Sequence, residues 1–120
     1  MTLSPMLATL AEAPLQSQLL VYEPKYDGIR ALVEITPGGK GRNPMVRLWS
    51  RNGNEKTSQF PSIVRALQDT TRGNKGPLIL DGEIVALDDQ GRPAGFQRLQ
   101  GRMHLLGAQD VERAERAQPA

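Results

Sequence analysis

A short run near the N-terminus places a lysine, a carboxylate, a glycine and an arginine close together, because residues 23–30 read EPKYDGIR. In an extended backbone Lys25 and Asp27 project to the same face. A bend at Gly28, the residue type least restricted in its backbone angles, could bring Arg30 to them. A lysine amine held near other cations or in a dry site loses its proton more easily and becomes a nucleophile. Arginine neutralises phosphoryl oxygens and carboxylates hold hard metal ions, so the cluster suits attack on a phosphate.

A second acidic motif, Asp81-Gly82-Glu83, lies between the apolar runs Leu78–Leu80 and Ile84–Leu87. Acidic residues inside a buried strand pattern conflict with the local sequence, and such conflicts are typical of functional sites. Two simpler interpretations stay open. The lysine run could be a salt-bridge cluster on a surface turn, and the acidic pair could face solvent on an edge strand.

The composition narrows the available chemistry to lysine, arginine and carboxylates. The 120 residues contain no cysteine and a single histidine, which excludes disulfides, thiolate zinc sites and histidine-based metal clusters. The net charge is +2, with eleven arginines against four lysines, which favours phosphate-bearing partners unless it only reflects genomic base content. No apolar run approaches the roughly 20 residues of a membrane helix, and residues 1–10 lack a secretory pattern, so we expect a cytoplasmic location and no membrane partner.

The elements that must position these residues predict an α+β fold, built mainly on an antiparallel sheet with a few short helices. Strand-type residues predict strands at Leu19–Glu23, Ile29–Ile35 and Met45–Ser50, the last two joined as a hairpin across the turn-rich residues 37–44. A short helix or turn is expected near Leu7–Glu12, and the apolar spacing over Pro61–Gln68 predicts a helix.

The second half of the chain is expected to begin with a buried strand pattern, made of two apolar runs with Asp81-Gly82-Glu83 set between them, followed by a turn at Asp88–Gly91. A helix is expected over Phe96–Leu106, and a solvated helix or frayed end over Gln109–Ala120. Packing roles rather than base stacking are expected for the aromatic residues Tyr22, Tyr26, Trp49, Phe60 and Phe96, and a helix-surface or capping role for His104.

Four motifs, taken in order, resemble those of a known family. Residues 25–30 resemble the Lys-x-Asp-Gly-x-Arg motif of ATP-dependent DNA ligases, RNA ligases and mRNA capping enzymes. Ser50-Arg51-Asn52-Gly53 resembles the second ligase motif, Asp81-Gly82-Glu83 the third, and residues 96–102 (FQRLQGR) the helix that follows it in DNA ligases. Residues 5–8 (PMLA) look like the lead-in of bacterial end-joining ligases. Residues 1–120 are thus identified, by resemblance, as the N-terminal portion of a DNA ligase adenylation domain, a partial nucleotidyltransferase domain of ATP-grasp-like type.

The resemblance also implies a substrate, a cofactor and roles for individual residues. Lys25 would attack the α-phosphate of ATP and hold AMP through a phosphoramidate bond, with Mg²⁺ or Mn²⁺ at the phosphates. The complete enzyme would pass AMP to a 5′-phosphate and seal nicked or broken double-stranded DNA. The implied roles are adenine contact for Glu23, nucleotide or DNA phosphate contact for Arg30 and Arg51, and contact with the ribose and the metal for Asp27 and Glu83.

The sequence lacks the elements that follow in the family, namely an adenine-stacking aromatic strand, the later glutamate and paired-lysine motifs and the oligonucleotide-binding (OB-fold) domain. No aromatic residue occurs after Phe96 and no lysine after Lys75. We therefore expect the chain alone to be inactive or very weak, to need the remainder of the ligase, and to work in a nucleoid-associated, cytoplasmic setting. Unpaired strand edges are expected to favour self-association.

Two other functional interpretations remain. The chain could belong to an RNA ligase or capping-type nucleotidyltransferase, although residues 96–102 favour a DNA ligase. It could also be a catalytically silent nucleic-acid-binding fragment, in which Arg30, Arg51, Arg98 and Arg102 contact backbone phosphates without chemistry.

Overall fold

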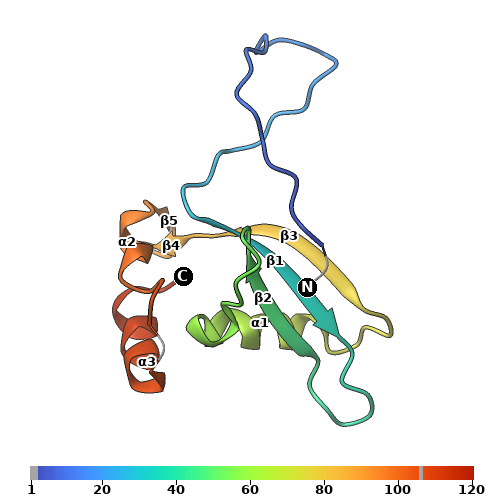
Figure 1. Cartoon of the computed structure of the whole chain (residues 1–120), viewed down its shortest axis with the longest axis vertical. Coiled ribbons are helices and arrows are strands. Elements are labelled where there is room, and N and C mark those ends of the chain that lie inside the picture. Colours follow the sequence, from blue (N-terminus) through green and yellow to red (C-terminus); the bar gives the residue numbers. More distant parts are fainter. Residues whose placement is uncertain (1–2, 106) are drawn as a thin grey trace.

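The computed structural model describes residues 3–105 and 107–120, and its main feature is a three-stranded antiparallel sheet (Figure 1). The strands are β1 (Ile29–Thr36), β2 (Met45–Ser50) and β3 (Leu78–Ile84), in the order β2-β1-β3. The aliphatic and β-branched sequence of β1 suits a central strand with neighbours on both sides. The predicted hairpin of β1 and β2 is confirmed, and the α+β class with a mainly antiparallel sheet is confirmed with it.

Helix α1 (Pro61–Thr71) covers one face of the sheet (Figure 1). It begins at a proline, whose fixed φ and missing N–H fit the first helical position. Alternate side chains of β1 and β2 point to this helix and form the core with Phe60, which is 0% exposed. The buried residues of the sheet face include Ala31, Val33, Ile35, Val46 and Leu48, and α1 contributes Ile63, Val64 and Leu67.

The C-terminal part packs beside the sheet as a small β-hairpin and two helices (Figure 1). The short strands β4 (Ala86–Leu87) and β5 (Pro93–Ala94) flank the turn predicted at Asp88–Gly91. The turn is confirmed, because Gly91 has a φ of 74° and its N–H donates a hydrogen bond to the Asp88 carbonyl. The helix predicted over residues 96–106 is wrong in length. Only α2 (Gln97–Gln100) is helical, exposed His104 lies in the turn after it, and Leu106 is outside the described residues. The tail forms helix α3 (Ala108–Ala117).

The segment before β1 contains neither helix nor strand within residues 3–28; it starts beside the sheet, loops away from it and returns at β1 (Figure 1). The strand predicted at Leu19–Glu23 is wrong, and residues 7–12 form neither the predicted helix nor a turn. A strand needs a hydrogen-bonding partner, and an apolar sequence does not supply one. Tyr22 and Tyr26 are half exposed, so the packing role predicted for them is wrong, whereas that of Phe60 is confirmed.

Strand β3 is an exposed edge strand, whereas the sequence predicted that its acidic residues lie within a buried strand. It pairs only with β1 among the described strands, and its middle residues, Asp81 and Glu83 included, are exposed. Ile79 is 51% and Leu80 39% exposed, and an apolar groove of about 490 Å³ lies between β3 and α1. The acidic pair therefore lies on an exposed edge strand, which by itself does not exclude a functional role.

Arg102 joins the C-terminal part to the core and is 1% exposed. Its guanidinium donates to the carbonyls of Gln118 (2.9 Å) and Gln59 (2.8 Å), lies 3.4 Å from the Glu115 carboxylate and stacks over the Phe60 ring. The phosphate contact that the silent-binding interpretation gave to Arg102 is therefore wrong, because a side chain buried against backbone carbonyls cannot reach DNA.

Arg102→Ala is expected to lower the free energy of unfolding by about 3–5 kcal/mol, because it leaves buried carbonyls and Glu115 without their cation. Urea unfolding followed by the fluorescence of Trp49, the single tryptophan, measures this change. Arg116→Ala is the control, because it breaks an exposed pair with Glu112 and should change stability by less than about 1 kcal/mol. Equal effects of the two substitutions would contradict the structural role of Arg102.

The same cluster is expected to weaken in acid. Burial raises the pKa of Glu115, but hydrogen bonds from Ser62 and the Arg102 charge lower it more, so the net pKa lies below its usual 4.5. A carboxylate with a depressed pKa in the folded state contributes stability above its unfolded pKa. The contribution of Glu115 should therefore be lost as the pH falls below about 4.5 towards its folded pKa.

Candidate functional site

The sheet face opposite α1 carries a charged group formed by β1 and β3. The antiparallel register places Arg30 opposite Glu83 and Leu32 opposite Asp81. Directly opposed residues project to the same face of a sheet. Because Ala31 and its core neighbours point to α1, these four side chains point to the other side.

A cavity of about 750 Å³ lies over this charged group. Its floor comes from the two strands, and its walls come from two parts of the irregular N-terminal segment, residues 6–8 and residues 23–26. The cavity therefore brings together segments that are more than 70 residues apart in the chain. The lining side chains are Met6, Leu7, Ala8, Glu23, Pro24, Lys25, Tyr26, Arg30, Asp81 and Glu83, with Gly82 between the last two.

Arg30 lines the cavity and connects three segments of the chain. Its Nε and Nη2 atoms donate to the two carboxylate oxygens of Asp81 at 2.9 and 2.6 Å, and Nη1 donates to the carbonyl of Met6. The hydrogen bond from Arg30 holds the pKa of Asp81 below its usual range. The Arg30 side chain is 29% and the Asp81 side chain 49% exposed, so the pair is open to solvent on one side.

Lys25 lies in the irregular segment just before β1, and its exposed side chain lines the same cavity as Asp81 and Glu83. Glu23, two residues earlier, lines the cavity as well. Lys25, Arg30 and the later acidic motif therefore line one cavity, although they come from three different segments.

Asp27 lies apart from this group. Its carboxylate accepts a hydrogen bond of 3.2 Å from the Phe96 amide, which ties the segment before β1 to the start of α2, and it is not among the residues that line the cavity. Among the described residues, no three His, Cys, Asp or Glu side chains lie close enough together to form a metal site. Of the two expected metal ligands, only Glu83 is at the cavity.

Arg51 also lies outside the cavity lining, in a tight turn at the end of β2. The Gly53 amide donates to the Ser50 carbonyl at 2.9 Å, and Gly53 has a φ of 79°, a conformation that favours glycine. Ser50–Gly53 therefore form a tight turn of the kind that an Asn-Gly dipeptide favours, and this turn leaves Arg51 exposed.

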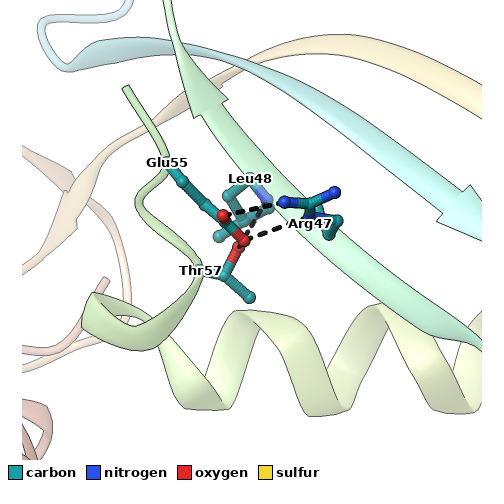
Figure 2. Close-up of polar contacts among 4 residues, drawn as sticks. All are labelled: Arg47, Leu48, Glu55 and Thr57. Atoms are coloured by element: carbon teal, nitrogen blue, oxygen red, sulfur yellow. Dashed lines mark hydrogen bonds and ion pairs between the residues drawn. The ribbon is translucent and has the colours of Figure 1, made fainter. Parts of the chain in front are cut away.

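The strand that leads into this turn is held by polar contacts to the segment after it (Figure 2). Arg47 donates to Glu55 at 3.2 and 3.0 Å, and Thr57 links the two segments by donating to Glu55 and accepting from the Leu48 amide. The Arg47 guanidinium also lies 4.7 Å from the centre of the Trp49 ring. These contacts fix the position of the second motif relative to β2.

Gly28 is needed for a close approach, and the chain bends there as predicted, but without a glycine-only backbone conformation. Its φ is not positive, unlike that of four other described glycines. A Cβ added to Gly28 would lie 2.1 Å from the carbonyl oxygen of Ile84, where β1 and β3 meet. The glycine therefore lets the chain enter β1 directly against the end of β3, which brings the Lys25 segment to the acidic strand.

The sequence did not indicate the apolar wall at residues 6–8 or the pairing of Arg30 with Asp81. Side chains alternate between the two faces of a strand, so the sequence places Asp81 and Glu83 on the same face. Only the register of β1 with β3 shows which residues of β1 lie beside them. The composition of Pro5–Ala8 does not indicate that these residues line a cavity. Only their resemblance to the lead-in of bacterial end-joining ligases could have drawn attention to them.

Comparisons with known proteins agree with this fold and site. The sequence model of the ATP-dependent DNA ligase domain family matches residues 5–119. The chain is 40% identical over 101 residues to the multifunctional non-homologous end joining DNA repair protein LigD of Mycobacterium tuberculosis, covering 83% of this chain and 12% of that protein. It is 38% identical over 100 residues to the bifunctional non-homologous end joining protein LigD of Bacillus subtilis, covering 82% of this chain and 15% of that protein.

An archaeal relative extends the comparison. The chain is 35% identical over 101 residues to a DNA ligase of Pyrobaculum calidifontis, covering 83% of this chain and 15% of that protein. No solved structure gives a significant match. The chain belongs to the family of ATP-dependent DNA ligase domains, which confirms the resemblance inferred from its four motifs.

The chain spans only 10–15% of the length of the curated relatives that it matches, so their complete activities do not pass directly to it. Among the described residues, no helix is long and apolar enough to cross a membrane.

Proposed function

We propose that this chain supplies the nucleophilic lysine of an ATP-dependent DNA ligase and part of the pocket in which that lysine becomes adenylated. The observation that supports the proposal best is the shared cavity, in which Lys25 lies with Arg30 and the Asp81-Gly82-Glu83 strand. A cavity of about 750 Å³ is within the range of small-molecule sites, roughly 300–1,000 Å³. The family membership supports the same conclusion.

In the proposed reaction the Lys25 amine attacks the α-phosphorus of ATP. A bond forms between Nζ and phosphorus, the bond from phosphorus to the pyrophosphate oxygen breaks, and the amine proton passes to solvent. The negative charge that builds on the phosphoryl oxygens requires nearby cations. Arg30 at the cavity and exposed Arg51 are the proposed phosphate contacts, and Glu23 is the proposed adenine contact.

The residues present fit a hard divalent cation in part. Mg²⁺ is commonly held by one or two carboxylates, with phosphate and water oxygens completing its shell, so a complete protein cage is not needed. Glu83 is the proposed ligand at the cavity, whereas the Asp27 carboxylate is hydrogen-bonded to the Phe96 amide outside the lining and is not proposed as a ligand in this arrangement. The bound cation would neutralise charge on the leaving pyrophosphate.

In the complete enzyme, AMP on Lys25 would pass to the 5′-phosphate of a nick or break in double-stranded DNA. The proposed partners are therefore DNA and the remainder of the ligase, and the proposed location is the nucleoid within the cytoplasm. We propose that the chain alone is very weakly active, because the electrostatic contacts of later family motifs are needed around the triphosphate.

The test is covalent labelling with α-labelled ATP and Mg²⁺ or Mn²⁺, followed by a denaturing gel. The chain is assayed alone, and also as a chimera in which residues 5–119 replace the matching residues of an end-joining relative, so that missing contacts are restored. The expected result is an acid-labile adduct, faint for the chain and strong for the chimera. A folded chimera that neither forms an adduct nor seals a nick would exclude the proposal.

We also propose that the chain self-associates through β3, whose open edge and neighbouring apolar groove could pair with a second copy. Light scattering should show a species larger than a monomer at high concentration. Ile79→Lys, which puts a charge on the exposed edge, should shift the population to monomer, whereas Met45→Lys on the opposite edge strand β2 should not. A clean monomer at all concentrations would contradict this interface.

A further inference from the structure

We propose that Arg30 and Asp81 act together as a clamp that holds residues 6–8 in place as the apolar wall of the nucleotide cavity. In this arrangement Asp81 is a positioning residue, and Met6 and Leu7 offer an apolar surface to the base of the nucleotide. The inference rests on the proposed function, because it assigns a nucleotide to the cavity, but the clamp itself can be tested without any nucleotide.

The contacts of Arg30 support a positioning role. A guanidinium that donates to both oxygens of one carboxylate is held in a single plane, which fixes the direction of its other N–H groups. Another nitrogen of the same group donates to the Met6 carbonyl. One side chain of β1 thus joins β3 to the N-terminal segment at the point where that segment reaches the sheet.

The wall has little else to hold it. Residues 3–14 form neither helix nor strand, and the side chains of Met6 and Leu7 are 85% and 57% exposed although they line the cavity. An extended segment without packing should move freely unless polar contacts fix it. The Arg30 bond to the Met6 carbonyl is such a contact, and Asp81 fixes Arg30.

The distribution of polar and apolar groups fits a nucleotide. Lys25 and Arg30 contribute positive charge to the cavity lining, and Met6, Leu7 and Ala8 contribute apolar surface. A nucleotide combines the same two kinds of group, because its phosphates are charged and its flat base gains free energy from apolar contact.

The clamp and a simple phosphate contact predict opposite results for Asp81→Ala. If Arg30 served only to bind phosphate, removing Asp81 would free its charge and strengthen ATP binding. If Asp81 positions the wall through Arg30, its removal should weaken binding. Arg30→Lys separates charge from geometry, because lysine keeps the charge but cannot form the two-pronged pair.

The first measurement is the mobility of the wall, without nucleotide. Because the chain has no cysteine, spin labels can be attached at Leu10→Cys, a fully exposed site next to the wall, and at Thr36→Cys at the end of β1. We expect one narrow distance distribution in the parent protein and a broad one in Asp81→Ala, Arg30→Ala and Arg30→Lys. A distribution that stays narrow in Asp81→Ala would overturn the clamp.

The second measurement is the dissociation constant for ATP, determined by calorimetry on the same variants. We expect about a tenfold increase for Asp81→Ala and a larger one for Arg30→Ala, which also removes the proposed phosphate contact. The double variant should bind no more weakly than Arg30→Ala, because residues that act as one unit have non-additive effects. Asp69→Ala is the matched control. It breaks the Arg72–Asp69 pair on α1, away from the cavity, and should leave both readouts unchanged.

Unchanged or tighter ATP binding in Asp81→Ala would show that residues 6–8 are not a wall for the nucleotide, even if the distance distribution broadens. If neither the chain nor the chimera, both without substitutions, binds ATP, the proposed function is wrong. The role of residues 6–8 as a wall for the nucleotide is then wrong as well. The spin-label result then still decides whether the clamp exists, so the two failures are distinguishable.

Discussion

Lys25→Ala is expected to remove covalent labelling by α-labelled ATP completely, a loss of at least about a thousandfold in adduct formation. The amine is the only atom of the proposed site that forms a bond to phosphorus, so its loss cannot be offset by the remaining charges. In the chimera, nick sealing should disappear with the adduct. Labelling and sealing are quantified on the same gels against the parent protein.

Lys40→Ala is the matched control, because Lys40 is exposed in the loop between β1 and β2 and does not line the cavity. It should label like the parent protein. Since Lys25 is itself exposed and makes no described contribution to the core, its replacement should leave the urea unfolding curve unchanged. An adduct that persists in Lys25→Ala would assign the nucleophile to another residue.

Local signals in the sequence were sufficient to predict β1, β2 and α1. Alternating apolar residues define the core face of β1 and β2, the glycine-rich residues between them define a turn, and the spacing of Ile63, Val64 and Leu67 defines the helix face. These features depend on neighbours within a few residues. The structure therefore reproduces them with shifts of at most a few residues at the ends.

The failed predictions depend on which segments meet in space. An apolar run at residues 19–23 has strand-type residues, but no strand of the described structure pairs with it. The apolar residues of β3 indicated burial, whereas burial depends on a neighbour that the sheet order does not supply. Arg102 is buried because carbonyls of residues 59 and 118 surround it, and these lie far from it in the sequence.

The candidate site, like the fold, could be predicted from the sequence only in part. Residue types identified Lys25, Arg30 and Glu83 as chemically suited to a phosphate, and the structure places all three at one cavity. The spacing of residues in the sequence also grouped Asp27 with them. In the structure the Asp27 carboxylate accepts a hydrogen bond from the Phe96 amide, and Asp27 does not line the cavity. The sequence does not indicate this contact, because it joins residues 69 positions apart.

Gly28→Ala is expected to lower the free energy of unfolding by about 3 kcal/mol, the upper part of the range for an overpacked site. The added Cβ would lie 2.1 Å from the Ile84 carbonyl oxygen and 3.0 Å from a Val85 methyl group, so β1 and β3 must separate at this end. Separation there also moves the Lys25 segment away from Glu83. Adduct formation by the chimera should therefore fall even at temperatures where it stays folded.

Gly82→Ala tests whether this effect comes from the close approach or from the loss of any glycine at the site. Gly82 is on β3 and lines the same cavity, but a Cβ there would meet no atom within 4 Å, and its φ is not positive. Its replacement should leave stability within about 0.5 kcal/mol of the parent. Because both substitutions add one methyl group, a difference between their urea midpoints would measure the strand contact. Equal midpoints would mean that β1 does not enter the sheet against Ile84, and the position of Lys25 beside the acidic strand would lose its structural basis.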